Sequence, residues 1–600
     1  MKKLLIYIVL GGALLISSCR EDFLNLAPQD QLTEAAYFTT PDQFKASTAS
    51  FYGKLLSWAS QDKMGNIFSF MDFGSDLSSN VKDVGEAGQT GYGLGSITIP
   101  SADYYWDNTY SYIRSVNLLL KKADAYTGNK TDIKQYVAEA KFFRAWHHFF
   151  LLKRYGGVPV VTTVLDLNSP ELTGPRNSRY EVVTRILSDL SEAIPDLPTE
   201  QAISAADKGR ISKWAAEAFK ARVELYEATW RKYTGVTTDF KGSAGPTKDE
   251  VATFLADAIA LTKDVMDNGG YALWNYNTTL NNRSNYFLYN IDGTGSNPLG
   301  LDKNSNNEFI LQSVYDYTLR KSGSQITRNA WLLTPSRKLM DMYLCTDGLP
   351  VDKSPLFQGY STVNKEFQNR DYRMLSNVLG AGTLPAAGSV SLTDGVNYGF
   401  GNAKFNSWNF TVTSYRSDNT ESQNYPQIRL AEVYLIYAEA LMELNGSISD
   451  ADLNLSINLI RARAGVAPLT NALVTANGLN MLNEIRRERA LEMYCENTRF
   501  DDLKRWGIAE TELNKDVCGM VVGGASYPTD FKDATGAPTS KYVPTKYGYG
   551  EAAVATGKGT LNCLVVMPGV NHNFKRDNYL FPLPTAQLQL NSKLVQNNGY

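Results

Sequence analysis

Apolar residues recur at helical spacing along the first half of the chain. Five segments place them three or four positions apart, which is the spacing of an amphipathic helix: 104–126, 131–153, 179–194, 211–232 and 250–268. In the first of these, Ile113, Val116 and Leu119 fall on one face. Glycine pairs follow two of the segments, at Gly156-Gly157 and Gly269-Gly270, and glycine commonly ends a helix. The pattern therefore predicts a helix over each segment.

The second half alternates between helical and irregular patterns. Helical spacing returns in three segments: 426–445, 450–464 and 482–498. Long stretches rich in Asn, Gly, Ser and Tyr show no such period, and we expect loops and short strands there: 270–330 and 345–425. Residues 507–600 are again mostly irregular.

Helix pairs joined by short turns are typical of tetratricopeptide-like stacking, although that consensus is poor here. We therefore expect a mostly α fold, a tetratricopeptide-like helical superhelix of about four helix pairs. Long irregular inserts and short strands would form its ligand-binding face.

The start of the chain is similar to a bacterial lipoprotein signal. Lys2 and Lys3 precede an apolar run over 4–16, too short for a permanent membrane span of roughly 20 residues. The run ends at Ser17-Ser18-Cys19, which resembles a lipobox. An ordinary signal peptide with a chance cysteine is the alternative. We expect lipidation of Cys19, and hence a protein anchored to the outer membrane rather than spanning it.

The acidic pair Glu21-Asp22 follows the expected lipidation site. It resembles a short surface-export signal of some Gram-negative lipoproteins, and a plain flexible tether is the alternative. We therefore expect the anchored protein to face the outside of the cell.

Charge and cysteine content narrow the function classes. The formal net charge is −3, and it becomes −5 when the two lysines of the signal are lost, so no broad basic face for nucleic acid is expected. Beside Cys19 the chain has four cysteines, none spaced as a metal knuckle: Cys345, Cys495, Cys518 and Cys563. These four cysteines could form up to two disulfides, or they could be free buried thiols.

Aromatic residues make up 12% of the chain, and many tyrosines lie among Asn, Gly and Ser, as at 286–289 and 547–550. Exposed aromatic rings beside amides suit sugars, because the C–H face of a sugar stacks while its hydroxyls bond to amides. We nevertheless expect most of the aromatic residues in helix cores.

Recognisable motifs follow one another in order along the whole chain. They are Ala138–Trp146 with Tyr155–Pro159, Lys208–Ile211 with Lys213–Ala216, Ile428–Ala440, Asn458–Gly465, Arg486–Arg489 with Arg499, Asp502–Gly507, Phe581–Pro584 and Gln596–Tyr600. The ordered set resembles the SusD/RagB family of outer-membrane nutrient-binding lipoproteins, whose type is starch binding. Asn497 stands where the family usually has Gly, and Ser592 and Asn598 stand where it often has Pro.

The resemblance implies a function, a partner and no cofactor. Members sit as lids over a SusC-like TonB-dependent barrel transporter and deliver captured oligosaccharides to it. The helices typically face the transporter, and the inserts typically bind the ligand. A peptide-binding lid of the same transporter type is the alternative, and a surface glycoside hydrolase or a purely structural adaptor is less favoured.

Many charged residues of these motifs lie on or beside predicted helices, where a buried arginine needs a carboxylate or carbonyl partner. We expect them to pin helices together rather than to bind ligand: Arg429, Glu432, Glu439, Arg461, Arg463, Glu488, Arg489, Arg499, Asp502 and Arg505.

Candidate ligand-binding residues lie in three loop regions, chosen by composition as aromatic platforms flanked by polar groups. They are Asp76, Asn80 and Tyr92 in 73–107; Trp274, Tyr276, Arg283, Tyr286 and Tyr289 in 271–292; and Trp331 in the third region, near Tyr315.

No catalytic or metal-binding motif stands out in the sequence. The chain has three histidines, and His147 and His148 are adjacent, so on a helix they point about 100° apart and form no metal pair. Glycoside hydrolysis needs only two carboxylates, but nothing singles out a pair. We expect a binding protein and not an enzyme.

We divide the chain into four parts: a lipoprotein signal peptide at 1–18, an N-terminal SusD-like region at 19–235, an insert with candidate binding loops at 236–345, and a C-terminal SusD/RagB region at 346–600.

Overall fold

A computed structural model describes most of the chain after the first 36 residues. The residues that it describes are 37–55, 72, 74–80, 93–235, 239–321, 333–361, 363–379, 400–405, 422–521 and 550–600. No helix within these ranges is both long enough and apolar enough to cross a membrane.

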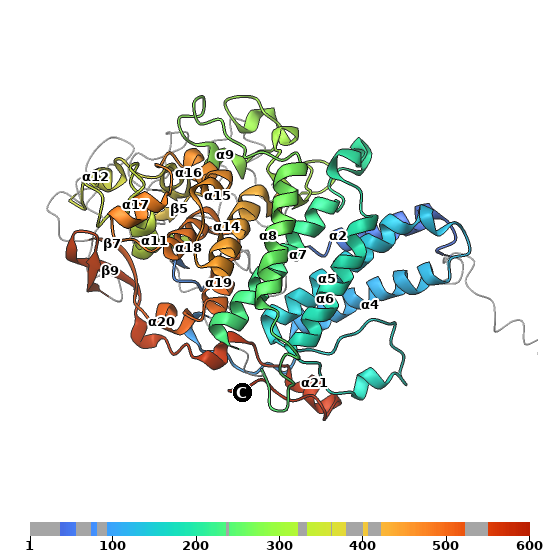
Figure 1. The fold of residues 1–600 in the computed structure, drawn as a ribbon. Helices are drawn as coiled ribbons and strands as arrows, with labels where there is room; N and C mark the ends of the chain where they lie inside the picture. Colours follow the sequence, from blue (N-terminus) through green and yellow to red (C-terminus); the bar gives the residue numbers. More distant parts are fainter. Residues whose placement is uncertain are drawn as a thin grey trace, which may run out of the picture.

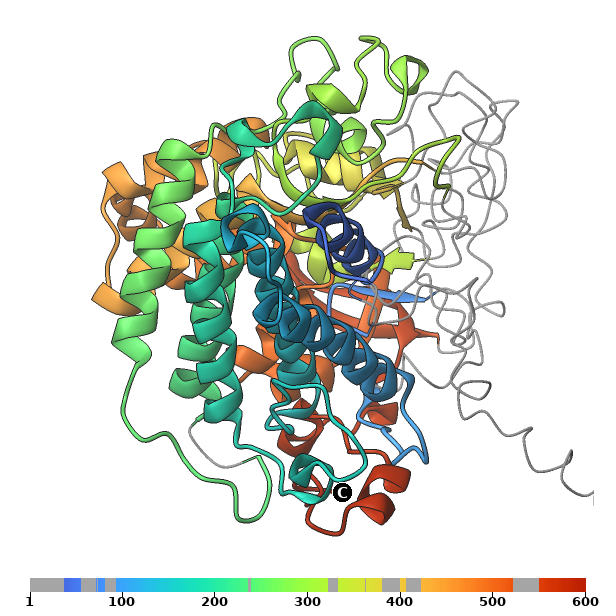
Figure 2. The same cartoon turned by 90° about the vertical axis from the view of Figure 1, so that its right-hand side faces the viewer.

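Long helices packed side by side form one half of the molecule (Figure 1). They are α4 (Tyr104–Asp124), α5 (Lys134–Tyr155), α6 (Arg179–Ala193), α7 (Lys213–Thr229), α8 (Val251–Asn268) and α14 (Leu430–Asn445). α5 packs on α4 and α6, α8 packs on α7 and α14, and the short α2 (Pro41–Tyr52) packs on α4 and α5 (Figure 2). The mostly α, tetratricopeptide-like fold predicted from the sequence is confirmed.

Local sequence sets where these helices begin and end. Asp103 caps α4 by accepting the backbone N–H of Tyr105 at 2.9 Å, and Ser178 with Glu181 forms a capping box at α6. α5 ends at Gly156, whose φ of +75° is a conformation that glycine adopts without steric cost.

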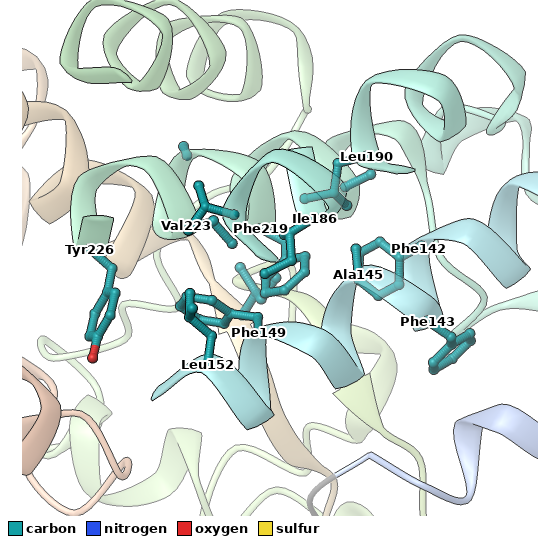
Figure 3. Packing of buried hydrophobic residues seen from close by; sticks show 14 of the residues in the cluster. Phe142, Phe143, Ala145, Phe149, Leu152, Ile186, Leu190, Phe219, Val223 and Tyr226 are labelled. Carbon is teal, nitrogen blue, oxygen red and sulfur yellow. The ribbon is translucent and has the colours of Figure 1, made fainter. Parts of the chain in front are cut away.

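The largest core lies between these helices. In Figure 3, Phe142 and Phe149 of α5 lie beside Phe219 of α7, with ring centroids 5.3 and 5.6 Å from Phe219. Residues 574–583 complete the same core, which also holds Ile428 and Val433. This core therefore includes residues from both sides of the boundary predicted between residues 235 and 236. The division of the chain into four parts stays a prediction.

The second half is built from short elements. The helices are α9 (Ser284–Leu288), α11 (Arg337–Met342), α12 (Val363–Phe367), α13 (Tyr372–Asn377), α15 (Asp450–Leu455), α16 (Ile457–Arg463), α17 (Asn471–Ala476), α18 (Met481–Glu492), α19 (Arg499–Arg505), α20 (Ala509–Leu513) and α21 (Thr585–Leu590). All strand pairs are antiparallel: β1 (Ser78–Asn80) with β3 (Leu333–Pro335), β2 (Phe309–Ser313) with β6 (Tyr425–Arg429), β4 (Val378–Leu379) with β5 (Gly401–Asn402), and β9 (Gly559–Met567) between β7 (Val517–Val521) and β8 (Glu551–Thr556).

Three expected helices differ from the structure. The segment 450–464 is divided into α15 and α16, because Ser456 leaves the helical conformation with φ of −136° and ψ of −96°. The segment 426–445 begins as strand β6, because Tyr425–Arg429 pair with β2, and its helix starts only at Leu430. The segment 482–498 stops being helical after Glu492, since Cys495 and Asn497 have φ of +62° and +60°. Asn tolerates this left-handed conformation, which explains how Asn497 replaces the family's usual glycine.

Candidate functional site

Three candidate aromatic residues of the segment 271–292 lie inside the protein. Trp274, Tyr286 and Tyr289 are exposed by only 2%, 1% and 2%, and they belong to a second core under the irregular segments. The expectation that these three rings are exposed is therefore wrong. That Trp274, Tyr286 and Tyr289 contact a ligand stays an untested prediction.

Contacts from distant parts of the chain explain this burial. The Tyr289 ring lies 5.2 Å from that of Phe405, and its hydroxyl donates to Glu496 Oε1 at 3.0 Å. The backbone N–H of Trp274 donates to Glu308 Oε2 at 2.9 Å. Loop-like composition does not reveal this core, because the partners lie 34 to 207 residues away along the chain.

The other two candidate residues of the same segment do reach solvent. Tyr276 is 36% exposed, and its ring centroid lies 4.8 Å from that of Trp274. Arg283 is half-buried at the start of α9. These two remain candidates for ligand contact.

Asp76 has a structural role. It accepts from Arg499 Nε and Nη2 at 2.8 Å each and also pairs with Lys338, so it links the strand β1 to α19 and α11. Burial alone would raise the pKa of Asp76, but Arg499 and Lys338 hold this pKa well below its usual value. The Asn80 backbone pairs with Leu333. Cys19, Tyr92 and Trp331 lie outside the described residues.

The charged motif residues pin helices to one another, as predicted. Arg429 contacts Glu308 at 3.0 Å and Glu492 at 2.7 Å, and Arg463 contacts the same two carboxylates at 2.5 Å. Arg505 of α19 donates to both carboxylate oxygens of Glu439 in α14 at 2.7 Å. All of these side chains are almost completely buried, and bidentate pairing of this kind is how a buried guanidinium is satisfied.

A cleft of about 440 Å³ opens between the α4–α5 helix pair and the segments around β6, α14 and α19. This volume is within the range of small-ligand sites. Leu55 and Asp72, the described residues on either side of 56–71, both line it. Its aromatic lining comes from many elements: Tyr104, Tyr105, Tyr112, Trp146, Phe149, Phe150, Phe219, Tyr226, Tyr425, Phe500 and Phe581.

Two helices supply the aromatic wall of this cleft. Tyr104, Asn108 and Tyr112 are spaced four residues apart on α4 and so share one face, and Trp146 and Phe150 do the same on α5. Tyr104 is 42% exposed, and the other four side chains are half-buried. An aromatic wall with amides from Asn108, Gln427 and Asn497 can stack a sugar ring and bond its hydroxyls.

Charged side chains hold the wall in place. The Arg154 guanidinium lies 4.5 Å from the Tyr105 ring and 4.1 Å from the Phe581 ring, and it pairs with Asp103 at 3.2 Å. Arg222 of α7 contacts Glu432 of α14 at 2.5 Å and lies 5.9 Å from the Trp146 ring. These contacts fix the helices on both sides of the cleft before any ligand arrives.

Burial shifts the pKa of several titratable groups of the lining, among them Asp72 and His147. Burial raises the pKa of Asp72 to about 7, even though its Oδ1 accepts the Arg499 backbone N–H at 2.7 Å. Burial lowers the pKa of His147 to about 3, and the histidine pair is part of the buried interior, as expected. Within the described ranges, no three His, Cys, Asp or Glu side chains are grouped so that they could hold a metal ion. The four cysteines after residue 19 are free and buried.

This cleft was not predicted from the sequence. Most aromatic residues were expected in helix cores and ligand contacts were expected in loops, although the candidate region 73–107 includes Tyr104 at the start of α4. Tyr112 lies on the same face as Val116 and Leu119, so helical spacing gave no signal that it would line a cleft, and only Tyr104 and Asn108 lie beyond the apolar stripe.

The fold and site define a helical-repeat scaffold with an aromatic cleft, and the comparisons with known proteins agree with the fold. Residues 270–600 match the family described as "SusD family", and residues 23–225 match the family described as "Starch-binding associating with outer membrane". The chain belongs to the SusD family.

Relatives and solved structures extend over most of its length. A SusD-like protein of Bacteroides ovatus is 24% identical over 506 residues, which are 83% of this chain and 82% of that protein. A solved SusD-like carbohydrate binding protein from Bacteroides fragilis has a TM-score of 0.67 at 21% identity, covering 93% of this chain and 99% of its own. A laminarin binding SusD-like protein has a TM-score of 0.57 at 21% identity, covering 93% and 99%. At these identities the solved structures show a shared fold.

Proposed function

We propose that this protein is a lipid-anchored, non-catalytic receptor at the cell surface that captures oligosaccharides and delivers them to a partner SusC-like TonB-dependent transporter. Membership of a family described as starch-binding and associating with the outer membrane supports the glycan and the location. The lipobox at Cys19 supports the anchor.

One observation carries the ligand assignment, and it is the aromatic cleft. Arg154 lies against the rings of Tyr105 and Phe581, and Arg222 lies 5.9 Å from the Trp146 ring, so these apolar faces of the lining are held in place and little conformational entropy is lost on binding. Asn108, Gln427 and Asn497 supply hydrogen-bonding groups beside it. Tyr276 and Arg283 form a second, smaller set of solvent-reaching candidates.

Affinity gel electrophoresis with a panel of soluble polysaccharides tests glycan binding by purified residues 20–600. We expect slower migration in at least one polysaccharide and release of no product sugars. Cleavage of the polysaccharide would favour a hydrolase. Binding of oligopeptides but not of polysaccharides, measured by calorimetry, would favour the peptide-binding lid.

The anchor and the partner need separate tests. We expect radiolabelled palmitate to enter the full-length protein and not the Cys19→Ala variant, and we expect the wild type to be accessible to protease on intact cells. A barrel transporter should co-purify from detergent-solubilised outer membranes. An unacylated, intracellular protein would contradict this part of the proposal.

A further inference from the structure

The cations and acids that line the cleft differ in how far they reach solvent. The side chains of Lys153, Arg154 and Arg222 are 26%, 14% and 21% exposed. Lys54, which also lines the cleft, is exposed to solvent. Of the five lining acids, Asp501 is 20% exposed, and the others are almost completely buried.

The buried charges of the lining are balanced among themselves or with neighbours behind the wall. Arg489 and Arg505 contact Asp502 at 2.8 Å, and Arg429 contacts Glu496 at 2.8 Å. At the mouth, Lys153 pairs with Asp501 at 2.5 Å, Arg154 with Asp103 at 3.2 Å and Arg222 with Glu432 at 2.5 Å. Lys54 is therefore the mouth cation whose charge no carboxylate of the described residues neutralises, in a chain whose net charge is −3.

Lys54 is the cation at the mouth that is least committed to the fold. It follows α2, and its Nζ lies 5.0 Å from the centre of the Tyr112 ring. No carboxylate of the described residues lies within ion-pair distance of it. The cation thus lies beside an aromatic ring of the wall and is available to a ligand.

We infer that the cleft takes an anionic saccharide, a sugar chain that carries carboxylate or sulfate groups, and this inference rests on the proposed function. The aromatic wall stacks the ring, and the cations at the mouth attract the acidic substituent. A neutral saccharide would use the wall and leave the Lys54 charge without a ligand partner. Burial raises the pKa of Asp72 to about 7, which reduces the negative charge of the floor near neutral pH and is consistent with this assignment.

Matched probes separate ring stacking from charge. Calorimetry with residues 20–600 would compare oligogalacturonate with its methyl ester, and sulfated dextran oligosaccharides with plain dextran oligosaccharides. We expect at least one charged probe of a pair to bind at least tenfold more tightly than its neutral match, with an affinity that falls as salt rises. The pair that discriminates identifies carboxylate or sulfate as the recognised group.

Charge reversal at the mouth places the effect in the cleft. We expect Lys54→Glu to weaken the charged probe about tenfold and to leave the neutral probe unchanged. Lys241→Glu makes the same charge change at an exposed residue outside the cleft and should leave both unchanged. Equal losses in the two variants would mean nonspecific attraction and would overturn the inference.

Different binding results would contradict the preference for an anionic saccharide and glycan capture itself. If only neutral polysaccharides bind, or if the charged and neutral members of each pair bind equally, the anionic assignment is wrong while glycan capture stands. If no saccharide of either kind binds, the proposed function itself is wrong.

Discussion

Two aromatic-rich regions of this protein differ in the solvent exposure of their rings. The segment 271–292 has the composition of an exposed binding loop, yet Trp274, Tyr286 and Tyr289 are buried. The α4–α5 pair has the pattern of a core helix pair, yet Tyr104, Tyr112 and Trp146 line a cleft and reach solvent. The difference teaches that ring exposure is decided by which distant segments pack nearby, and not by the polarity of neighbours in sequence.

The largest effect should come from removing a buried ring of the first region. We expect Tyr286→Ala to lower the free energy of unfolding by about 3–5 kcal/mol, as truncation of a large core side chain does. Urea denaturation followed by circular dichroism measures this. A loss below about 1 kcal/mol, together with weaker ligand binding, would show that Tyr286 belongs to a binding surface after all.

A pH-dependent effect should come from the floor of the cleft. The pKa of Asp72 is about 7 in the folded protein and 3.8 as the ordinary value, so the folded state binds this proton more tightly. Asp72 therefore lowers the stability of the fold progressively as pH rises from about 4 to about 7, and the loss is constant above that. Relative to the wild type, we expect the Asp72→Asn variant to be more stable at pH 8 than at pH 5 by about 2.8 kcal/mol, since about two pH units below the folded pKa are crossed and each is worth about 1.4 kcal/mol. Thermal unfolding at both values measures it. A gain in the opposite direction would mean that the folded-state pKa is not raised.

A smaller effect should come from the exposed ring of the cleft. We expect Tyr104→Ala to weaken saccharide binding about tenfold, which corresponds to about 1.4 kcal/mol, while stability changes by less than about 0.5 kcal/mol. Calorimetry with the best-bound polysaccharide fragment measures it. Leu167→Ala, at a 96% exposed position outside the cleft, is the control and should bind normally.

The smallest effect should come from Tyr276, the exposed ring of the first region. We expect Tyr276→Ala to change affinity by less than about twofold, or about 0.4 kcal/mol, because its ring packs on Trp274 outside the cleft. The same calorimetry ranks it against Tyr104→Ala. If Tyr276→Ala has the larger effect, the ligand binds at 271–292 and not in the cleft.

Local pattern was a good guide wherever local contacts decide the structure. The helix expected over 104–126 is α4, and that expected over 250–268 is α8, because their apolar stripes lie within the segments themselves. The ion pairs of Arg429, Arg463 and Arg505 also followed from residue type, since a buried guanidinium needs a carboxylate.

Long-range contacts decided the rest. The sheet of β7, β8 and β9 was not expected, because Cys518 pairs with Val565 across nearly fifty residues and neither strand has a long alternating pattern. The cleft likewise joins Tyr104 to Gln427 and Asn497, and no local period connects them. The exposure of an individual ring depends on such contacts, and so candidate residues chosen by composition were the weakest part of the sequence analysis.

The last segment of the first core has a consequence for biogenesis. Phe574, Tyr579 and Phe581 pack among helices whose residues precede them by several hundred positions, and Asn597 donates to the carbonyl of Tyr155 at 3.0 Å. A polypeptide threaded across a membrane from its amino end cannot close that interior until its final portion has emerged. Chains that end before this portion should leave the first core open and be degraded more readily by proteases.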